Sequence, residues 1–272
     1  MREVETENSI RQIVRSSVES YASGFEARHL AEADDPDGTI NMKIHNVFIA
    51  ALGKDIQYYT ALVRSLDSSL GNLLERMAIN IAKLFYEVHQ SVEGPLYSSQ
   101  TKIIAELLEG YKNRNNPLKP SIDHYRRLRD MEPESGAGIK THVSDYYLID
   151  PETQRHYLIE LKIGGDLDNK KARAEKEAIF EQYAILSNLL GNEADIRCFF
   201  ATAYNRFGEG KEWNQTRVLQ FFAREELLIG RDFWDFVCCA RGGYEIVIDE
   251  YSASAHLIMK ALESIKGRYL HD

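Results

Sequence analysis

Apolar and polar positions alternate between residues 144 and 163, and this alternation predicts a β-hairpin. Its strands, residues 146–149 and 156–163, are rich in the β-branched and aromatic side chains that suit a pleated sheet. The segment 150–154 carries Pro151 and side chains that can bond nearby backbone, which is turn chemistry. One face of the second strand is predicted to be a core face, formed by Tyr157, Ile159, Leu161 and Ile163. The other face carries His156, Leu158, Glu160 and Lys162.

The length of the hairpin loop decides which side chains face each other across the two strands. A four-residue loop places Asp150 opposite Arg155, and counting outward places Asp145 opposite Glu160. Two carboxylates at that separation repel each other, and a hard cation such as Mg²⁺ removes the conflict. Lys162 is then placed to orient a water molecule and to stabilise charge on a phosphoryl oxygen. The same pattern is common in surface ion pairs, but the apolar opposite face and the basic run that follows favour a functional site.

Apolar residues repeat at helical spacing over most of the remaining chain. The predicted helices cover residues 7–30, 55–66, 68–92, 99–111, 232–240 and 252–265, with one more that ends near Leu190. Continuous or short apolar runs predict strands at 196–203 and 217–222. This combination predicts an α/β fold in which helices flank a mixed central β-sheet. We expect a helical N-terminal region over residues 1–67 and a core over residues 68–272.

Glu75 is a candidate further ligand in the predicted helix 68–92. It lies one turn after Gly71, which would allow close packing against another element beside this carboxylate. Most helical glutamates are simply solvated, so the sequence leaves both interpretations open.

Charge and cysteine content limit the partners and the cellular compartment that we expect for this protein. The net charge of −9 argues at face value against nucleic acid, but residues 110–130 hold six cations against two acids. An acidic chain with such a basic segment can still hold DNA. No apolar run reaches about 18 residues, so no membrane span is expected. The three cysteines have no metal-binding spacing, and we expect reduced thiols in a cytoplasm.

The residues Asp145 and Glu160-Leu161-Lys162 on a hairpin, followed by a helix and an apolar strand, resemble the core of the PD-(D/E)xK nuclease superfamily. Ser144 stands where the superfamily's name has proline. The run 159–171 is similar to type II restriction endonucleases of the TdeIII-like group, and so are residues 69–75 and 228–234. The short triad is a weak motif, whereas its extension through Lys171 is much more specific.

The resemblance implies a restriction-endonuclease-like core and a type II site-specific deoxyribonuclease. Such an enzyme would use Mg²⁺ to cut double-stranded DNA at a short palindromic site, and the resemblance offers a GGNCC-like sequence as a candidate. It would act as a homodimer beside a cognate DNA methyltransferase for the same site. The resemblance assigns the metal carboxylates to Asp145 and Glu160, the catalytic lysine to Lys162 and an upstream helical glutamate to Glu75.

The basic run after the hairpin is the predicted DNA contact. A helix is predicted to start a few residues beyond Lys162, and one side of its first turns carries Lys170 and Arg173. Lys171 lies near the edge of that side. Together with Asn169, these three residues are expected to touch phosphates, which position DNA without reading its sequence. Further contacts are predicted at Arg126 and Arg127, and a dimer interface is predicted within residues 44–74.

Two alternatives stay open from the sequence. The same core could serve a repair or recombination nuclease with little sequence preference. A different class is a DNA-binding protein whose carboxylates bind a structural cation without hydrolysing anything.

Overall fold

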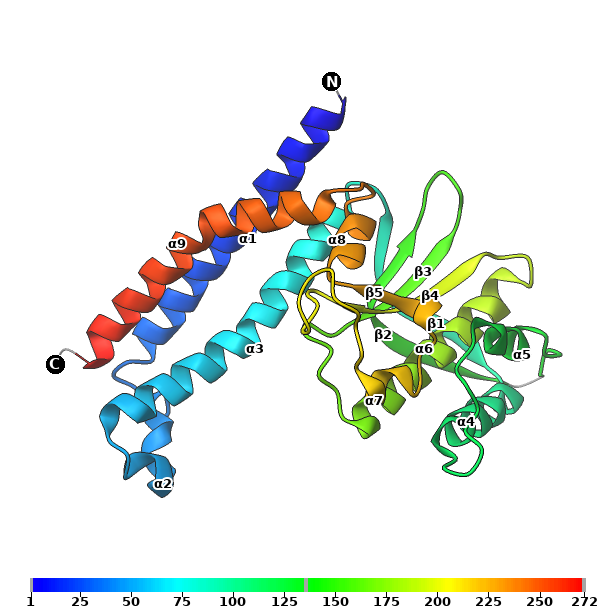
Figure 1. The fold of residues 1–272 in the computed structure, drawn as a ribbon, viewed down its shortest axis with the longest axis horizontal. Helices are drawn as coiled ribbons and strands as arrows, with labels where there is room; N and C mark the ends of the chain where they lie inside the picture. Colours follow the sequence, from blue (N-terminus) through cyan, green and yellow to red (C-terminus); the bar gives the residue numbers. More distant parts are fainter. Residues whose placement is uncertain (1, 135–136, 271–272) are drawn as a thin grey trace. The chain divides into compact units, whose positions relative to one another are not determined.

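The computed structural model describes residues 2–134 and 137–270. The chain divides into two compact units, one formed by the residues before 81 together with those from 245 on, and the other by residues 81–244 (Figure 1). We call these the helical unit and the sheet unit and describe each by itself.

The sheet unit is built on one five-stranded mixed β-sheet (Figure 1). In spatial order, β1, β2 and β3 pair antiparallel, whereas β3, β4 and β5 pair parallel. The strands are β1 Glu87–Leu96, β2 Gly138–Ile149, β3 His156–Leu161, β4 Ile196–Thr202 and β5 Leu227–Ile229. This arrangement confirms the predicted α/β fold with a mixed central sheet.

The hairpin of β2 and β3 has the predicted register. Its pairs run from Ile149 with His156 to Tyr146 with Ile159, and the Asp150 backbone N–H donates to the Arg155 carbonyl at 2.9 Å. The Asp150 side chain accepts hydrogen bonds from two backbone N–H groups of the loop, which holds the turn closed. The turn chemistry therefore fixes the strand register, and with it the face on which Glu160 lies.

Helices bury both faces of this sheet. On one face, α6 (Asn169–Leu190) contacts β1, β3 and β4. On the other face, α8 (Arg231–Val237) brings Phe236 to 4.9 Å from Tyr157, between ring centroids. The remaining helices of this unit are α4 Ser98–Lys112, η2 Ile122–Tyr125, α5 Arg126–Arg129, α7 Thr216–Leu219 and η3 Arg224–Glu226.

Two predicted elements are wrong, and tertiary pairing explains the first. The predicted helix 68–92 ends at Ala82, and residues 87–92 belong to β1, because this segment pairs with β2 and buries Val92 beneath α6. β1 is an edge strand, which tolerates Pro95. The predicted strand 217–222 contains part of the short helix α7, and the strand parallel to β4 is β5 instead.

The helical unit consists of α1 (Arg2–Ala31), η1 (Asn41–His45), α2 (Val47–Ala50), α3 (Lys54–Ala82) up to residue 80, and α9 (Gly243–Leu270) from residue 245. Its core joins residues from α1, α3 and α9: Phe25, Tyr58, Ala61, Leu62, Ile265 and Tyr269, together with Ile40. The α3 helix runs through the predicted boundary at residue 67. A division into domains at that boundary stays a prediction. Within the described ranges, every helix is too short or too polar to cross a membrane.

Candidate active site

The hairpin brings Asp145, Glu160 and Lys162 together at the end of β3. The Lys162 Nζ lies 3.5 Å from Asp145 Oδ2 and 3.5 Å from Glu160 Oε2. The Leu161 backbone N–H donates to Asp145 Oδ2 at 2.9 Å, which holds this carboxylate toward the lysine. The hydrogen bonding to β4 continues one residue past the end of β3, since the Lys162 N–H donates to the Ala201 carbonyl. The structure thus assembles the three residues that the sequence pattern singled out.

A third carboxylate, which the sequence analysis missed, comes from α6. Glu175 Oε2 lies 3.3 Å from Lys162 Nζ, so the ammonium contacts carboxylates from three elements. The helix begins at a fixed point because Asp168 Oδ1 accepts the Lys171 backbone N–H as an N-cap. That start sets the face of α6 on which Glu175 lies.

Gln182 is the second residue that the sequence analysis missed. Its Nε2 donates to Glu160 Oε1 at 3.1 Å, and its Oε1 is buried without a hydrogen-bond partner among the described residues. Gln182 lies seven residues after Glu175, on the same face of α6. The seven-residue spacing places the two side chains on one face of a helix, but the sequence does not say that this face meets the sheet.

The α6–β3 connection depends on one glycine. Gly165 has a φ of +64°, and a Cβ at this position would lie 2.8 Å from Thr202 Cγ2 and 3.0 Å from Trp213 Cζ2. Only glycine meets both demands without moving its neighbours. The close turn carries the chain directly from Lys162 into the helix that bears Glu175.

A buried ion pair anchors α6 beside the site. Lys176 is fully buried and donates to Glu226 Oε1 of η3 and, at 3.0 Å, to the Tyr125 hydroxyl. Its ammonium also lies over the rings of Phe180 at 4.3 Å and Phe222 at 4.9 Å. Since a buried charge without its partner is strongly destabilising, this contact fixes the helix one residue away from Glu175.

The electrostatics of the site favour one positive charge among the acids. Burial, then the nearby Asp145 carboxylate, raises the pKa of Glu160 to about 8. Burial alone would lower the pKa of Lys162, but the carboxylates of Asp145, Glu160 and Glu175 raise it above its usual value. Lys162 is therefore an ammonium at neutral pH, and it can donate hydrogen bonds but cannot accept a proton.

The donor set has the chemistry of a Mg²⁺ site. Asp145, Glu160, Glu175 and the buried Gln182 Oε1 offer only oxygen atoms, which hard cations prefer. Across residues 2–134 and 137–270, no group of three or more His, Cys, Asp or Glu side chains is arranged to hold a metal ion as it stands. The cation that the three carboxylates share in this structure is the Lys162 ammonium.

The predicted DNA contacts divide into two groups. Asn169, Lys170 and Lys171 are exposed at the start of α6, and Lys171 lies one turn before Glu175 on the side of the site.

The arginines of the prediction are engaged by carboxylates instead. Arg173 contacts Glu177 at 3.0 Å and Glu109 of α4 at 3.5 Å. Arg126 and Arg127 lie on α5 and each forms one ion pair at the exposed surface. All of these DNA contacts stay predictions.

Glu75 lies on α3 in the helical unit, whereas the other site residues lie in the sheet unit. Its role as a ligand stays a prediction.

Fold and site together define a nuclease of the restriction-endonuclease-like class, with an Asp, a Glu-x-Lys and helices on a mixed sheet. The chain belongs to the family described as type II restriction endonuclease, HinfI, whose model matches residues 6–255. The protein is thus a site-specific type II deoxyribonuclease by family. This match does not name the TdeIII-like group, so that finer resemblance stays a prediction. Neither the curated proteins nor the solved structures give a match.

Glu175→Gln tests the carboxylate from α6. We expect about 10–100-fold slower DNA cleavage, because the change removes a negative charge beside Lys162 while keeping the side chain's size. Glu177→Gln is the matched control, since this neighbour on α6 contacts Arg173 rather than Lys162. Cleavage rates under equal metal concentration decide the point, and equal rates for the two variants would remove Glu175 from the site.

Glu160→Gln tests the electrostatics through stability. The pKa of Glu160 is about 8 in the folded chain against an ordinary 4.5, so the folded state keeps a proton that the unfolded chain loses between these values. The contribution of Glu160 is therefore fully present below about pH 4.5 and is lost as the pH rises through about 8. A glutamine does not titrate, so without divalent metal the variant should gain Tm relative to the wild-type chain as pH rises. Parallel Tm curves for the two proteins would show that Glu160 is not held protonated.

Proposed function

We propose that this chain hydrolyses phosphodiester bonds in double-stranded DNA at a short palindromic site and depends on Mg²⁺ to do so. The observation that carries the proposal is the Lys162 ammonium within 3.5 Å of three carboxylates at the end of β3. This arrangement of both charge signs around Lys162 suits hydrolysis of a phosphodiester. The acidic side chains can hold a metal cation, and the ammonium places a positive charge near the phosphate oxygens.

In this mechanism Asp145, Glu160 and Glu175 would hold the metal, and Gln182 Oε1 would offer a neutral oxygen beside them. The metal, when bound, supplies charge neutralisation for the attacking and leaving oxygens of an in-line displacement. Lys162 keeps its proton and directs its ammonium at a phosphoryl oxygen or at the attacking water. Asp145 is held in its orientation by the Leu161 N–H. Glu75 remains a candidate additional ligand.

DNA is held, on this proposal, by phosphate contacts from the exposed start of α6. Asn169, Lys170 and Lys171 lie in the first turn of the helix that carries Glu175. Arg126, Arg127 and Arg173 can reach phosphates only by exchanging the carboxylates that they contact in this structure. The two lysines are therefore the stronger candidates.

The family supports a proposal for the cellular setting of the protein. A restriction endonuclease would damage its host's own DNA unless that DNA is modified, so we propose a cognate methyltransferase for the same site and a cytoplasmic location. A GGNCC-like target rests on the TdeIII-like resemblance and stays a prediction.

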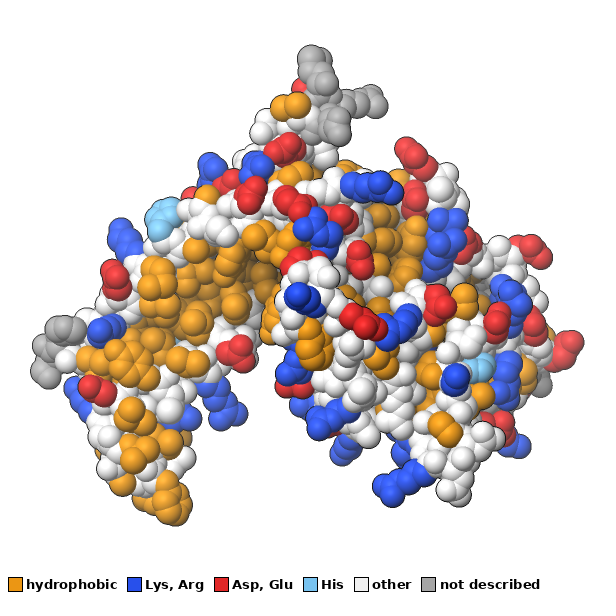
Figure 2. Space-filling view, in the orientation of Figure 1, with side chains coloured by type: hydrophobic (Ala, Val, Ile, Leu, Met, Phe, Trp, Pro, Cys, Tyr) orange, Lys and Arg blue, Asp and Glu red, His pale blue; other side chains and the backbone are white. Residues whose placement is uncertain are grey.

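We propose a homodimer, because two-fold symmetry gives each strand of a palindrome its own active site. An exposed apolar surface in the helical unit supports this proposal, and Figure 2 shows apolar side chains gathered there. Its members lie in or beside the predicted interface: Ile44, Val47, Phe48, Leu52, Ile56, Tyr59 and Val63. Ile56, Tyr59 and Val63 share one side of α3 by helical spacing.

Digestion of supercoiled plasmid tests the proposed reaction. The purified protein should give discrete fragments with Mg²⁺ and none with a chelator. Lys162→Met should cut about 10²–10³-fold more slowly, because it removes the positive charge at the phosphate. A smear would indicate a nuclease without sequence preference. Intact plasmid at every metal concentration would contradict the proposal.

Phe48→Asp tests the dimer. Phe48 is 84% exposed, and a buried charge at a self-complementary interface should convert the DNA-bound dimer to a monomer in sedimentation. Ile139→Asp places the same charge on an exposed apolar residue of β2 and should leave the mass unchanged. A wild-type protein that sediments on DNA as a monomer would disprove the dimer.

A further inference from the structure

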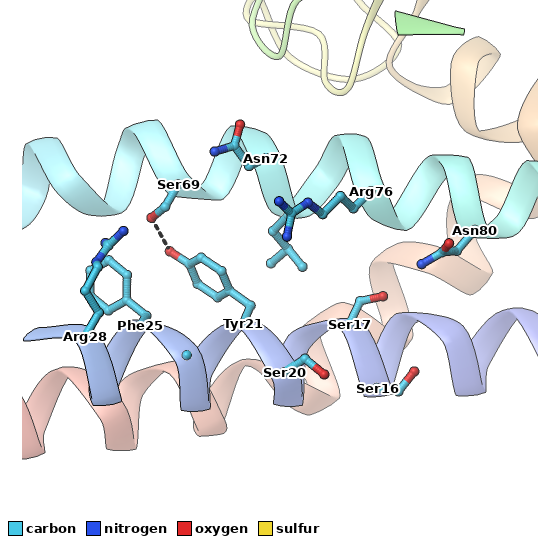
Figure 3. Close-up of a pocket in the computed structure, with 12 residues that line it drawn as sticks. Ser16, Ser17, Ser20, Tyr21, Phe25, Arg28, Ser69, Asn72, Arg76 and Asn80 are labelled. Carbon is cyan, nitrogen blue, oxygen red and sulfur yellow. Dashed lines mark hydrogen bonds between the residues drawn. The ribbon is translucent and has the colours of Figure 1, made fainter. Parts of the chain in front are cut away.

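The helical unit contains a polar groove between α1 and α3 (Figure 3). It encloses about 460 Å³, and small hydroxyl side chains line its α1 wall: Ser16, Ser17 and Ser20. The α3 wall presents Ser69, Asn72 and Arg76. A second hollow of about 490 Å³ shares Arg28, Ser69 and Asn72 with the first, so the two are neighbours, and together they are called the groove.

The charge of this groove is one-sided. Among the described residues, no Asp or Glu lines the groove. Four cationic side chains line it: Arg28, Lys43, Arg64 and Arg76. The chain as a whole carries a net charge of −9, so a cationic lining free of carboxylates is not a consequence of composition. A surface of this kind favours an anionic ligand.

Two of these arginines are available for a ligand. Arg64 and Arg76 are exposed, and neither forms an ion pair or hydrogen bond with another residue in the described part of the chain. Elsewhere in the same unit, Arg11 and Arg15 both contact Glu250, at 3.8 Å and 2.7 Å. The groove therefore holds cations that the fold itself does not use.

Hydrogen bonds fix the two walls relative to each other. The hydroxyls of Tyr21 and Ser69 lie 2.9 Å apart (Figure 3). Arg28 donates to Ser65 Oγ at 3.0 Å. The Arg28 guanidinium also lies over the Phe25 ring, 5.3 Å from its centroid. Tyr21, Ser69 and Arg28 are thus held in place before any ligand arrives.

We propose that this groove binds the sugar–phosphate backbone of duplex DNA, a contact that rests on the proposed function. From Arg64 to Asn80 the α3 wall spans about 24 Å at a rise of about 1.5 Å per residue. That length matches about seven base-pair steps of about 3.4 Å each, enough for several successive phosphates. Arginine, serine and asparagine side chains are the usual donors to phosphate oxygens.

The lining favours a duplex backbone over a single strand or a free nucleotide. Ligands with accessible bases are held by exposed aromatic rings on which the bases stack. The aromatic residues of the groove are not exposed: Phe25 is buried, and Tyr21 is half-buried with its hydroxyl bonded to Ser69. By helical spacing Ile56, Tyr59 and Val63 lie on the other side of α3 from Asn72 and Arg76. A dimer contact through that side of α3 leaves this part of the groove accessible.

The test measures binding of a fluorescent duplex by anisotropy, in chelator and at several salt concentrations. Arg64→Ala and Arg76→Ala should each weaken binding several-fold on every sequence and lower the magnitude of the salt slope by about one unit. Lys260→Ala, an exposed cation of α9 in the same unit, is the control and should change neither value. Unaltered Tm values would show that the variants fold normally.

The outcomes separate this proposal from the proposed function. A wild-type protein that binds and cuts duplex DNA while Arg64→Ala and Arg76→Ala behave like the control would overturn the groove alone. A wild-type protein that neither binds nor cuts duplex DNA would overturn both. The groove proposal would also be overturned if labelled ATP binds in a way that depends on Arg64 and Arg76 while the affinity of both variants for the duplex is unchanged.

Discussion

One lysine ammonium enclosed by three acidic side chains is the interaction on which the candidate active site depends. Asp145, Glu160 and Glu175 lie close enough to repel one another, and Lys162 contacts all three. Even with the Lys162 ammonium among them, burial and the Asp145 carboxylate raise the pKa of Glu160 to about 8, so this acid still holds a proton at neutral pH. The same contacts keep Lys162 charged. The site therefore favours a bound positive charge. Such a site suits a divalent metal, and the charge that it holds suits a phosphodiester.

The geometry of that cluster is set by the helix α6 as much as by the hairpin. The strands can place Asp145, Glu160 and Lys162, but the third carboxylate depends on how α6 rotates over the sheet. Lys176 restricts this rotation, because its buried ammonium is satisfied only when it meets Glu226 and Tyr125. A polar contact inside the core thus has a positional role that apolar packing alone would not provide.

The sequence predicted the part of the candidate site's geometry that local chemistry determines, which is the hairpin. The turn at Asp150 fixes the hairpin register, so the opposition of Asp145 and Glu160 could be counted along the chain before the structure was known. Glu175 could not be separated from Glu177, since the choice requires knowing which face of α6 meets the sheet. β1 was misassigned for a related reason. Its apolar residues continue a helical repeat, and only pairing with β2 makes the segment a strand.

The net charge of −9 is a poor guide to binding partners, because acidic and basic side chains gather on different parts of this protein. Carboxylates converge where a cation must be held, around Lys162. Cations without carboxylate partners lie elsewhere, at the start of α6 and in the groove beside Arg64 and Arg76. Long-range attraction to DNA is set by the local field of each surface rather than by the sum over the chain, since charges farther away than about 8 Å are screened at physiological salt. An acidic chain can therefore present DNA with cationic surfaces and still keep an acidic site for the reaction.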